Sequence, residues 1–132
     1  MKKPAIICVD DEKIILNSLK TLLKNEFGNQ YIIEVSESGE DALELVDELQ
    51  ESEISTVVLI SDWLMPQMKG DEFLIKLHKK FPNIKKIMLT GQADPQSVEN
   101  AKRNADLFKY MTKPWSDEQL LKTVKEALKN TN

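Results

Sequence analysis

Several short apolar runs of strand length in this chain end directly at a charged residue. The charged residues are Asp10 and Asp11 after the run 5–9, Asp62 after the run 57–61, and Lys113 after the run 107–112. If these runs are parallel neighbours in one sheet, the four side chains meet at a single edge of that sheet. Crowded carboxylates repel one another unless a divalent cation joins them, and oxygen ligands suit a hard cation. The pattern therefore predicts a Mg²⁺ site built from distant parts of the chain.

The apolar pattern alternates between strand and helix five times. Strands are expected over residues 6–9, 31–35, 57–60, 86–90 and 107–111. Helices are expected from the aspartates to Gly28, after Ser38, over 71–80, over 95–103 and after Ser116. Regular alternation requires right-handed crossovers, and it gives a parallel sheet with helices on both faces. The sequence thus predicts an α/β fold whose ligand crevice lies beyond the carboxyl ends of the strands.

The expected helix boundaries depend on particular residue types. Ser38 and Ser116 each begin a segment that resembles a capping box, and Asp94-Pro95 combines an N-cap with a proline at the first helical position. Proline at 82 disfavours helix in the residue before it. In the first helix, the apolar residues that recur at helical spacing are Ile14, Ile15, Leu19, Leu22 and Leu23.

Length and composition favour a single soluble domain. The chain has 132 residues, of which 41% are apolar and 30% are charged. We expect residues 4–129 to be structured and residues 130–132 to form a polar tail. The net charge of −4, without a basic stripe, does not indicate nucleic-acid binding, and the apolar runs are too short to cross a bilayer. Cys8 is the only cysteine and is expected to be a buried structural thiol, and a cytoplasmic location is the default.

Each residue at the predicted edge also has an ordinary structural explanation. Asp10 and Asp11 at a helix start can cap the helix and interact with its dipole. Asp62 can be a loop residue, Thr90 a strand-end hydroxyl and Lys113 part of a solvated turn. Together the residues are more specific, because they fall in order at the ends of the first, third, fourth and fifth predicted strands.

This combination resembles the receiver domain of bacterial two-component response regulators over essentially the whole chain. The segments that carry the resemblance are Val9-Asp10-Asp11-Glu12, Ser61-Asp62-Trp63-Leu64-Met65-Pro66, Met68-Lys69-Gly70, Met88-Leu89-Thr90-Gly91 and Thr112-Lys113-Pro114-Trp115. The resemblance implies a flavodoxin-like, doubly wound (βα)5 fold with a five-stranded parallel sheet of order 2-1-3-4-5.

The resemblance implies a role for each matching acid. Asp62 would be the phosphoacceptor, whose carboxylate attacks a phosphoryl group and becomes an aspartyl phosphate. The Mg²⁺ would be held by Asp62, by Asp11 directly, by Asp10 largely through a bound water, and by the backbone carbonyl of Leu64. A hard cation is needed there because the nucleophile and the phosphoryl donor are both anionic.

The resemblance also implies roles for the fourth and fifth strands. Lys113 would pair with the phosphoryl oxygens, Thr90 would hydrogen-bond one of them, and Gly91 would leave room for the group. The Lys113-Pro114 bond would be cis. Tyr110 matches the family's aromatic switch, in which the threonine moves toward the phosphate and the ring enters the vacated space. That movement would alter the face built from the fourth helix, fifth strand and fifth helix. The alternative is that Tyr110 only packs against a helix.

Leu64 and Gln92 stand two residues beyond the phosphoacceptor and the threonine, where this family tunes the lifetime of the phosphoryl group. The implied partners are a sensor histidine kinase or phosphotransfer protein as donor, and a downstream protein or attached output domain as target. Direct contact with nucleic acid or with a membrane is not expected, and a phosphorylation-dependent dimer stays open. The protein would catalyse its own phosphorylation and slow dephosphorylation without being an enzyme for other substrates.

Two other functions share a strand-end aspartate. A small Mg²⁺-dependent phosphatase or phosphotransferase usually has a second acid two residues beyond the nucleophile, where Leu64 stands here. A pseudo-receiver that only binds a protein usually lacks an acid or the lysine, and none is missing here.

Other residues near the site or rare in the chain have simpler expectations. His78 is expected at the surface. Met65 and Met68 are expected to pack, since thioethers suit soft metals. Trp63 adjoins Asp62 and should report on the site by fluorescence.

Overall fold

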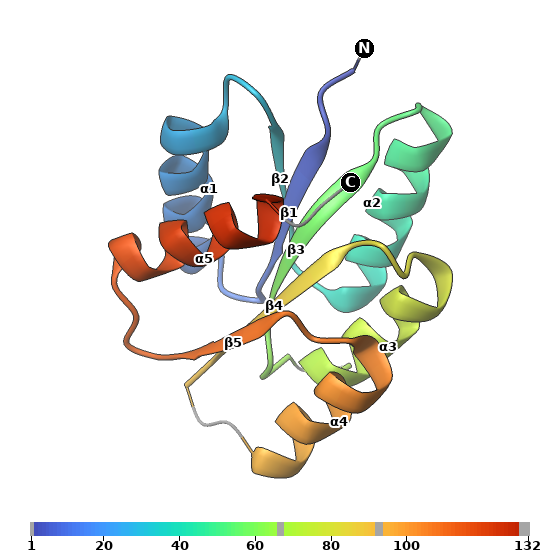
Figure 1. The fold of residues 1–132 in the computed structure, drawn as a ribbon, viewed down its shortest axis with the longest axis vertical. Helices are drawn as coiled ribbons and strands as arrows, with labels where there is room; N and C mark the ends of the chain where they lie inside the picture. The colour runs from blue at the N-terminus through green and yellow to red at the C-terminus, as the bar shows by residue number, and fades with distance from the viewer. Residues whose placement is uncertain (1, 66–67, 92–93, 130–132) are drawn as a thin grey trace.

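The computed structural model describes residues 2–65, 68–91 and 94–129. Its five strands form one parallel sheet in the order β2-β1-β3-β4-β5, with helices on both faces (Figure 1). The predicted fold class and strand order are therefore confirmed. The expected polar tail, residues 130–132, lies outside the described residues.

The elements alternate along the chain as the sequence predicted. The strands are β1 (Ala5–Val9), β2 (Ile32–Ser36), β3 (Thr56–Asp62), β4 (Lys85–Thr90) and β5 (Lys109–Thr112). The helices are α1 (Lys13–Phe27), α2 (Gly39–Glu51), α3 (Gly70–Lys80), α4 (Pro95–Ala105) and α5 (Asp117–Lys129). The fifth strand begins two residues later than predicted. α4 runs two residues further than predicted, to Ala105, and is capped by Asp106, which has a left-handed backbone with φ 51°.

The predicted helix starts carry the expected caps. The Ser38 hydroxyl accepts a hydrogen bond from the Asp41 N–H at 3.1 Å, and the Asp94 carboxylate accepts one from the Gln96 N–H at 3.2 Å. Before α5, Ser116 and Gln119 each accept from the other's backbone N–H, so this capping box is complete.

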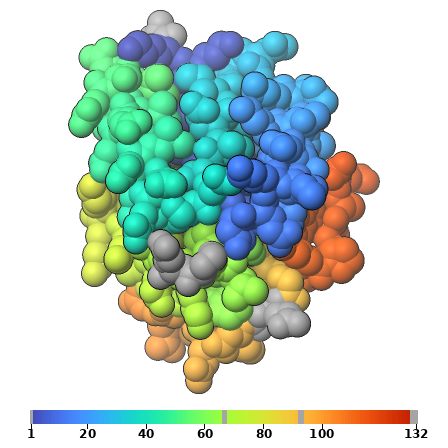
Figure 2. Space-filling view, turned by 180° about the vertical axis from the view of Figure 1, so that it is seen from behind, coloured from blue at the N-terminus to red at the C-terminus, as the bar shows by residue number. Residues whose placement is uncertain are grey.

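The sheet separates two apolar cores, because neighbouring residues of β1 point to opposite faces. Ile6 and Cys8 pack with α1 and α5, whereas Ile7 and Val9 pack with α2, α3 and α4. Burial raises the pKa of the Cys8 thiol to about 12, so this cysteine is a neutral, structural side chain as expected. Figure 2 shows the molecule from the side where α1 and α2, on opposite faces of the sheet, approach each other over the β2 edge.

Two expectations about single side chains need correction. Ile14 was grouped with the apolar residues of the first helix, but its side chain is 82% exposed. The buried stripe of α1 is formed by Leu16, Leu19, Leu23 and Phe27, and Ile14 lies two residues before Leu16, on the opposite side of the helix. His78 is partly buried at the end of α3, and burial lowers its pKa.

Within the described ranges, no helix combines the length and apolar character needed to cross a bilayer.

Candidate functional site

The carboxylates of Asp10, Asp11 and Asp62 meet at the carboxyl edge of the sheet. β1 and β3 are hydrogen-bonded neighbours with Val9 opposite Ser61, so the residues that follow Val9 lie beside the last residue of β3. One oxygen from each of the three carboxylates lies within 4.8 Å of the others. The meeting of acids that the sequence pattern predicted is therefore present.

Asp10 is the most buried of the three acids, with an exposed fraction of 1%. Its Oδ1 accepts a hydrogen bond from the Glu12 N–H at 2.9 Å, but its Oδ2 has no partner in the part of the chain that the structure describes. Burial, with a smaller contribution from the charge of Asp62, raises the pKa of Asp10 to about 6 against the lowering effects of the Glu12 N–H and Lys113. The site thus holds a carboxylate whose charge is only partly compensated by the protein.

Asp62 is 4% exposed and lies between opposing influences. Burial raises the pKa of its carboxyl, while Lys113 and the backbone N–H groups of Leu64 and Trp63 lower it. The Nζ of Lys113 lies 4.0 Å from Asp62 Oδ1. A carboxylate with a nearby cation and backbone donors is suited to act as a nucleophile toward an anionic group.

An open cavity of about 480 Å³ lies beside Asp62. The residues that line it are Asp11, Glu12, Asp62, Trp63, Leu64, Met65, Lys69, Gly91 and Lys113. Asp11 is exposed, and the Leu64 side chain is 65% exposed. The buried Asp62 carboxylate therefore lies beside a space that a small anion can enter.

Thr90 and Lys113 are held together at the ends of β4 and β5. The Lys113 N–H donates a hydrogen bond to the Thr90 carbonyl oxygen at 2.8 Å, and the Lys113–Pro114 bond is cis, as the resemblance implied. The Thr90 side chain is 0% exposed, and its Oγ1 has no hydrogen-bond partner among the described residues. A Cβ at Gly91 would lie 3.5 Å from Cδ of Lys113, so a side chain there would extend beside this lysine.

The remaining predicted residues lie near the site or outside the described chain. Tyr110 on β5 is 43% exposed, and Nζ of Lys102 on α4 lies 5.3 Å from its ring centroid. Met65 and Met68 are buried in the core on the α3 side, as expected of packing residues. Gln92 lies outside the described residues.

Sequence reasoning missed two polar residues beside the site. Asp71, in the first turn of α3, is 6% exposed and accepts a hydrogen bond from Nε1 of Trp63 at 3.2 Å. Lys69 places its Nζ 5.4 Å from the centroid of the Trp63 ring. An acid in the first turn of a helix usually interacts with the helix dipole at the surface, so nothing in the local pattern indicated that Asp71 is buried.

Comparisons with known proteins agree with this geometry. The family model of the response regulator receiver domain matches residues 6–125. The chain is 31% identical to the chemotaxis protein CheY1 of Helicobacter pylori over 129 residues, which cover 96% of this chain and 98% of that protein. Among solved structures, the response regulator receiver domain protein (CheY-like) from Methanospirillum hungatei superposes with a TM-score of 0.85 at 31% identity, covering 97% of this chain and 95% of that one.

Longer relatives match over only part of their length. The chain is 28% identical to the hydrogenase transcriptional regulatory protein HoxA of Cupriavidus necator over 127 residues. The match covers 96% of this chain and 24% of HoxA, so the chain spans about a quarter of the length of that relative.

Proposed function

This chain belongs to the response regulator receiver domain family, and on that premise we propose that it is a phosphorylation-controlled signalling switch whose acceptor is Asp62. The observation that carries the proposal is the meeting of Asp62 with Asp10, Asp11 and Lys113 beside one open cavity. The family match and all ten helices and strands fall within residues 4–129, which supports treating this segment as one receiver domain.

The acidic cluster fits a bound Mg²⁺ on the chemistry of its donors. It contains three carboxylates within 4.8 Å of one another, together with the unpaired buried Oδ2 of Asp10. The proposed ligands are Asp10, Asp11, Asp62 and the backbone carbonyl of Leu64, all of which offer the oxygen atoms that a hard cation prefers. When bound, the cation would neutralise part of the charge that the acceptor and an anionic donor bring together.

Asp62 carries the proposed transfer. One of its carboxylate oxygens attacks phosphorus and forms an O–P bond, while the bond from phosphorus to a histidine nitrogen or an acyl oxygen breaks and its electron pair leaves with the donor. Lys113 pairs with the phosphoryl oxygens, and the N–H groups of Trp63 and Leu64 lie beside the acceptor carboxylate. Slow attack of water on phosphorus then releases inorganic phosphate and restores Asp62.

Thr90 and Tyr110 are the proposed switch residues. The buried Thr90 hydroxyl lacks a partner in the described chain, so it gains a hydrogen bond when a phosphoryl oxygen arrives. Tyr110 is exposed between α4 and α5 and can turn inward once Thr90 moves. The face formed by α4, β5 and α5 would then present a different surface to a partner.

Leu64 and Gln92 are the proposed determinants of phosphoryl lifetime. The exposed Leu64 side chain lines the cavity and has no polar atom with which to orient an attacking water. Gln92 has an amide that can do so, which is the role that the family pattern assigns to its position.

The proposed donor is a histidine kinase or a phosphotransfer protein, and the proposed target is a downstream protein or an output domain. HoxA, a hydrogenase transcriptional regulatory protein, shows that a related sequence occurs within a longer protein. The proposed location is the cytoplasm, where such donors act.

A phosphorylation assay with a small acyl phosphate tests the acceptor and its rivals together. Mass spectrometry of the intact protein should show one added phosphoryl group in the wild type in the presence of Mg²⁺, and none in Asp62→Asn. The phosphatase alternative would be favoured if the protein released phosphate from a diffusible phosphomonoester while no phosphorylated protein accumulated. An unmodified wild type that still binds its partner would favour the pseudo-receiver alternative.

A further inference from the structure

A line of hydrogen bonds runs from the residue after Asp62 into helix α4. The indole Nε1 of Trp63 donates to Asp71 Oδ1 at 3.2 Å, and the side-chain amide of Asn100 donates to Asp71 Oδ2 at 3.0 Å. Asn100 in turn accepts a hydrogen bond from the side-chain amide of Asn104 at 2.7 Å. Trp63 follows β3, Asp71 lies in α3, and Asn100 lies in α4, so three separate segments meet at one carboxylate.

The Asp71 carboxylate is well placed to hold these segments together. Its side chain is 6% exposed, and each of its oxygens accepts from a different element. Hydrogen bonds to a charged acceptor are stronger than those between neutral groups, and leaving a buried carboxylate unpaired is costly. Movement of either donor away from Asp71 is therefore opposed.

Trp63 is also fixed through its backbone. Its N–H donates to the Leu89 carbonyl oxygen at 3.0 Å, and its carbonyl oxygen accepts from the Gly70 N–H at 2.8 Å. A Cβ at Gly70 would lie 2.6 Å from the Asp62 carbonyl oxygen and 2.7 Å from Cα of Trp63, so only glycine permits this approach. Any displacement of the segment after Asp62 must therefore be accommodated by the start of α3 and by the Trp63 side chain.

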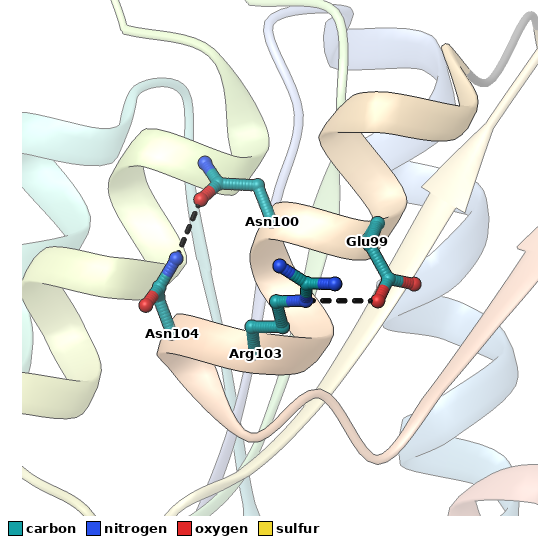
Figure 3. A network of polar contacts seen from close by, with 4 residues as sticks. All are labelled: Glu99, Asn100, Arg103 and Asn104. Atoms are coloured by element: carbon teal, nitrogen blue, oxygen red, sulfur yellow. Dashed lines mark hydrogen bonds and ion pairs between the residues drawn. The ribbon is translucent and has the colours of Figure 1, made fainter.

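The line of hydrogen bonds lies on one side of α4 only. In Figure 3, Asn100 and Asn104 lie toward the neighbouring helix, while Glu99 and Arg103 form a separate pair elsewhere on the same helix. The Arg103–Glu99 pair is exposed. A substitution of Arg103 therefore controls for the general effect of changing a polar residue of α4 outside the line of hydrogen bonds. Helix α4 also carries Lys102, whose Nζ lies 5.3 Å from the Tyr110 ring centroid, so it faces both the acceptor segment and the proposed switch residue.

Resting on the function proposed above, we propose that Asp71 is a positioning residue that couples the segment after Asp62 to helix α4 through Trp63 and Asn100. The backbone N–H groups of Trp63 and Leu64 lie beside the Asp62 carboxylate, so a phosphoryl group on that carboxylate acts first on this segment. The hydrogen bonds through Asp71 carry a displacement of this segment to α4, so phosphorylation does part of its work in moving that helix. A variant that lacks the connection binds at Asp62 without moving α4, so cutting the connection should tighten that binding.

A double-mutant cycle in the full chain tests this coupling, with beryllofluoride and Mg²⁺ as the probe of the phosphorylated state. Trp63→Phe removes the indole donor and Asn100→Ala removes the amide donor, so the two variants cut the same connection at opposite ends. Beryllofluoride affinity is measured by calorimetry, and the amide hydrogen exchange of residues 95–105 is measured with and without the probe. Arg103→Gln is the matched control on the same helix.

Each single variant is expected to bind beryllofluoride about fivefold more tightly than the wild type, because the coupling has been removed. The double variant should also bind about fivefold more tightly, and not about 25-fold, since its two changes act on one connection. Exchange of the α4 amides should respond to the probe in the wild type and in Arg103→Gln, but not in Trp63→Phe or Asn100→Ala.

Additive effects of the two changes, or an α4 response preserved in both variants, would overturn the coupling. If one of the two single variants does not fold, the hydrogen-exchange response of α4 in the other variant tests the proposal, because each substitution cuts the connection by itself. Absence of beryllofluoride binding by the wild type would instead contradict the proposed function itself, so the two failures are distinguishable.

Discussion

Strand β4 buries a polar side chain near each end, and the two ends satisfy these groups differently. At the amino end, Lys86 is 1% exposed, and its Nζ donates a hydrogen bond to the Ile84 carbonyl oxygen at 2.8 Å. At the carboxyl end, the buried hydroxyl of Thr90 has no partner in the described chain. The buried Oδ2 of Asp10, at the same edge of the sheet, has none either.

On the proposed function, this difference distinguishes a polar group with a structural role, Lys86, from one with a functional role, Thr90. An unpaired buried polar atom costs roughly 1–3 kcal/mol, so a folded chain tends to pair such atoms internally. At the amino end of β4, the buried Lys86 side chain finds its hydrogen-bond partner within the protein, at the Ile84 carbonyl oxygen. On the proposed function, a ligand in the open cavity beside the carboxyl end would supply the missing hydrogen-bond partner there. If the distinction holds, substitutions at the two ends should differ in their effects on stability and on phosphorylation.

The largest effect is expected from removing the cation at the carboxyl end. Lys113→Ala should lower the rate of phosphorylation by a small acyl phosphate about 100-fold, because it removes the ammonium that lies 4.0 Å from the proposed acceptor carboxylate. The rate is measured by intact-mass spectrometry over time in the presence of Mg²⁺. Lys109→Ala is the matched control, since Lys109 begins the strand that Lys113 follows and pairs with Glu126 at 3.4 Å. Equal phosphorylation rates in the two variants would show that the rate depends on the net positive charge of this region and not on the position of Lys113.

A smaller effect is expected at the amino end, and it depends on pH. Burial lowers the pKa of Lys86 from 10.5 to about 8, with Asp106 opposing the shift. Between these two values the unfolded chain holds a proton that the folded protein has released, so stability should rise with pH. From pH 7 to pH 10 this residue should add about 2 kcal/mol to the free energy of unfolding.

Urea unfolding of Lys86→Met at both pH values measures this contribution. The rise attributed to Lys86 should be absent from Lys86→Met and present in Lys85→Met, which removes the neighbouring, partly exposed lysine of the same strand. Phosphorylation should be unchanged in Lys86→Met, because this end of the strand takes no part in the reaction. A rise of the same size in Lys86→Met would assign the effect to other groups.

The acidic cluster should show the opposite dependence on pH when metal is absent. Burial raises the pKa of Asp10 from 3.8 to about 6, so the folded protein takes up a proton as the pH falls through 6, before the unfolded chain does. Asp10 therefore contributes stability that is fully present below 3.8 and is lost as the pH rises through 6. From pH 7 to pH 5, metal-free wild type should gain about 1 kcal/mol relative to Asp10→Asn.

Thermal unfolding with a chelator and with Mg²⁺ provides the measurement. Mg²⁺ should stabilise the wild type more than Asp10→Asn, and it should reduce the gain on acidification, since a bound cation favours the charged carboxylate. Identical Mg²⁺ stabilisation of the two proteins would remove Asp10 from the proposed ligand set.

Most of the fold followed from the sequence because the relevant signals are local. Apolar runs of strand length, two serine capping boxes and the Asp94-Pro95 pair marked the elements within a few residues. The carboxyl-edge meeting of Asp10, Asp11 and Asp62 also followed, because parallel strands place their ends together. The strand order itself needed the resemblance, since periodicity does not say which strands are neighbours.

What the sequence missed depends on contacts between distant segments. Lys86 lies in an expected strand, but its burial is set by the packing around β4 and not by the local pattern. Asp71 resembled an ordinary first-turn acid until Trp63 and Asn100 were seen to pair with it. Ile14 fitted the apolar content of its helix, but the choice of which side of α1 is buried is made by β1 and β2.

The smallest effect is expected from the Thr90 hydroxyl, and it tests the distinction between the two strand ends most directly. Thr90→Val keeps the shape of the side chain and removes a buried hydroxyl that has no partner in the described chain. The free energy of unfolding should rise slightly, by at most about 1 kcal/mol, because an unpaired polar group is lost. Beryllofluoride affinity should fall about fivefold, because one hydrogen bond to the bound group is lost. Thr90→Ser retains the hydroxyl and should retain the affinity. If Thr90→Val were destabilised while its affinity stayed unchanged, the hydroxyl would be a structural group like the Lys86 ammonium, and the contrast between the two ends would fail.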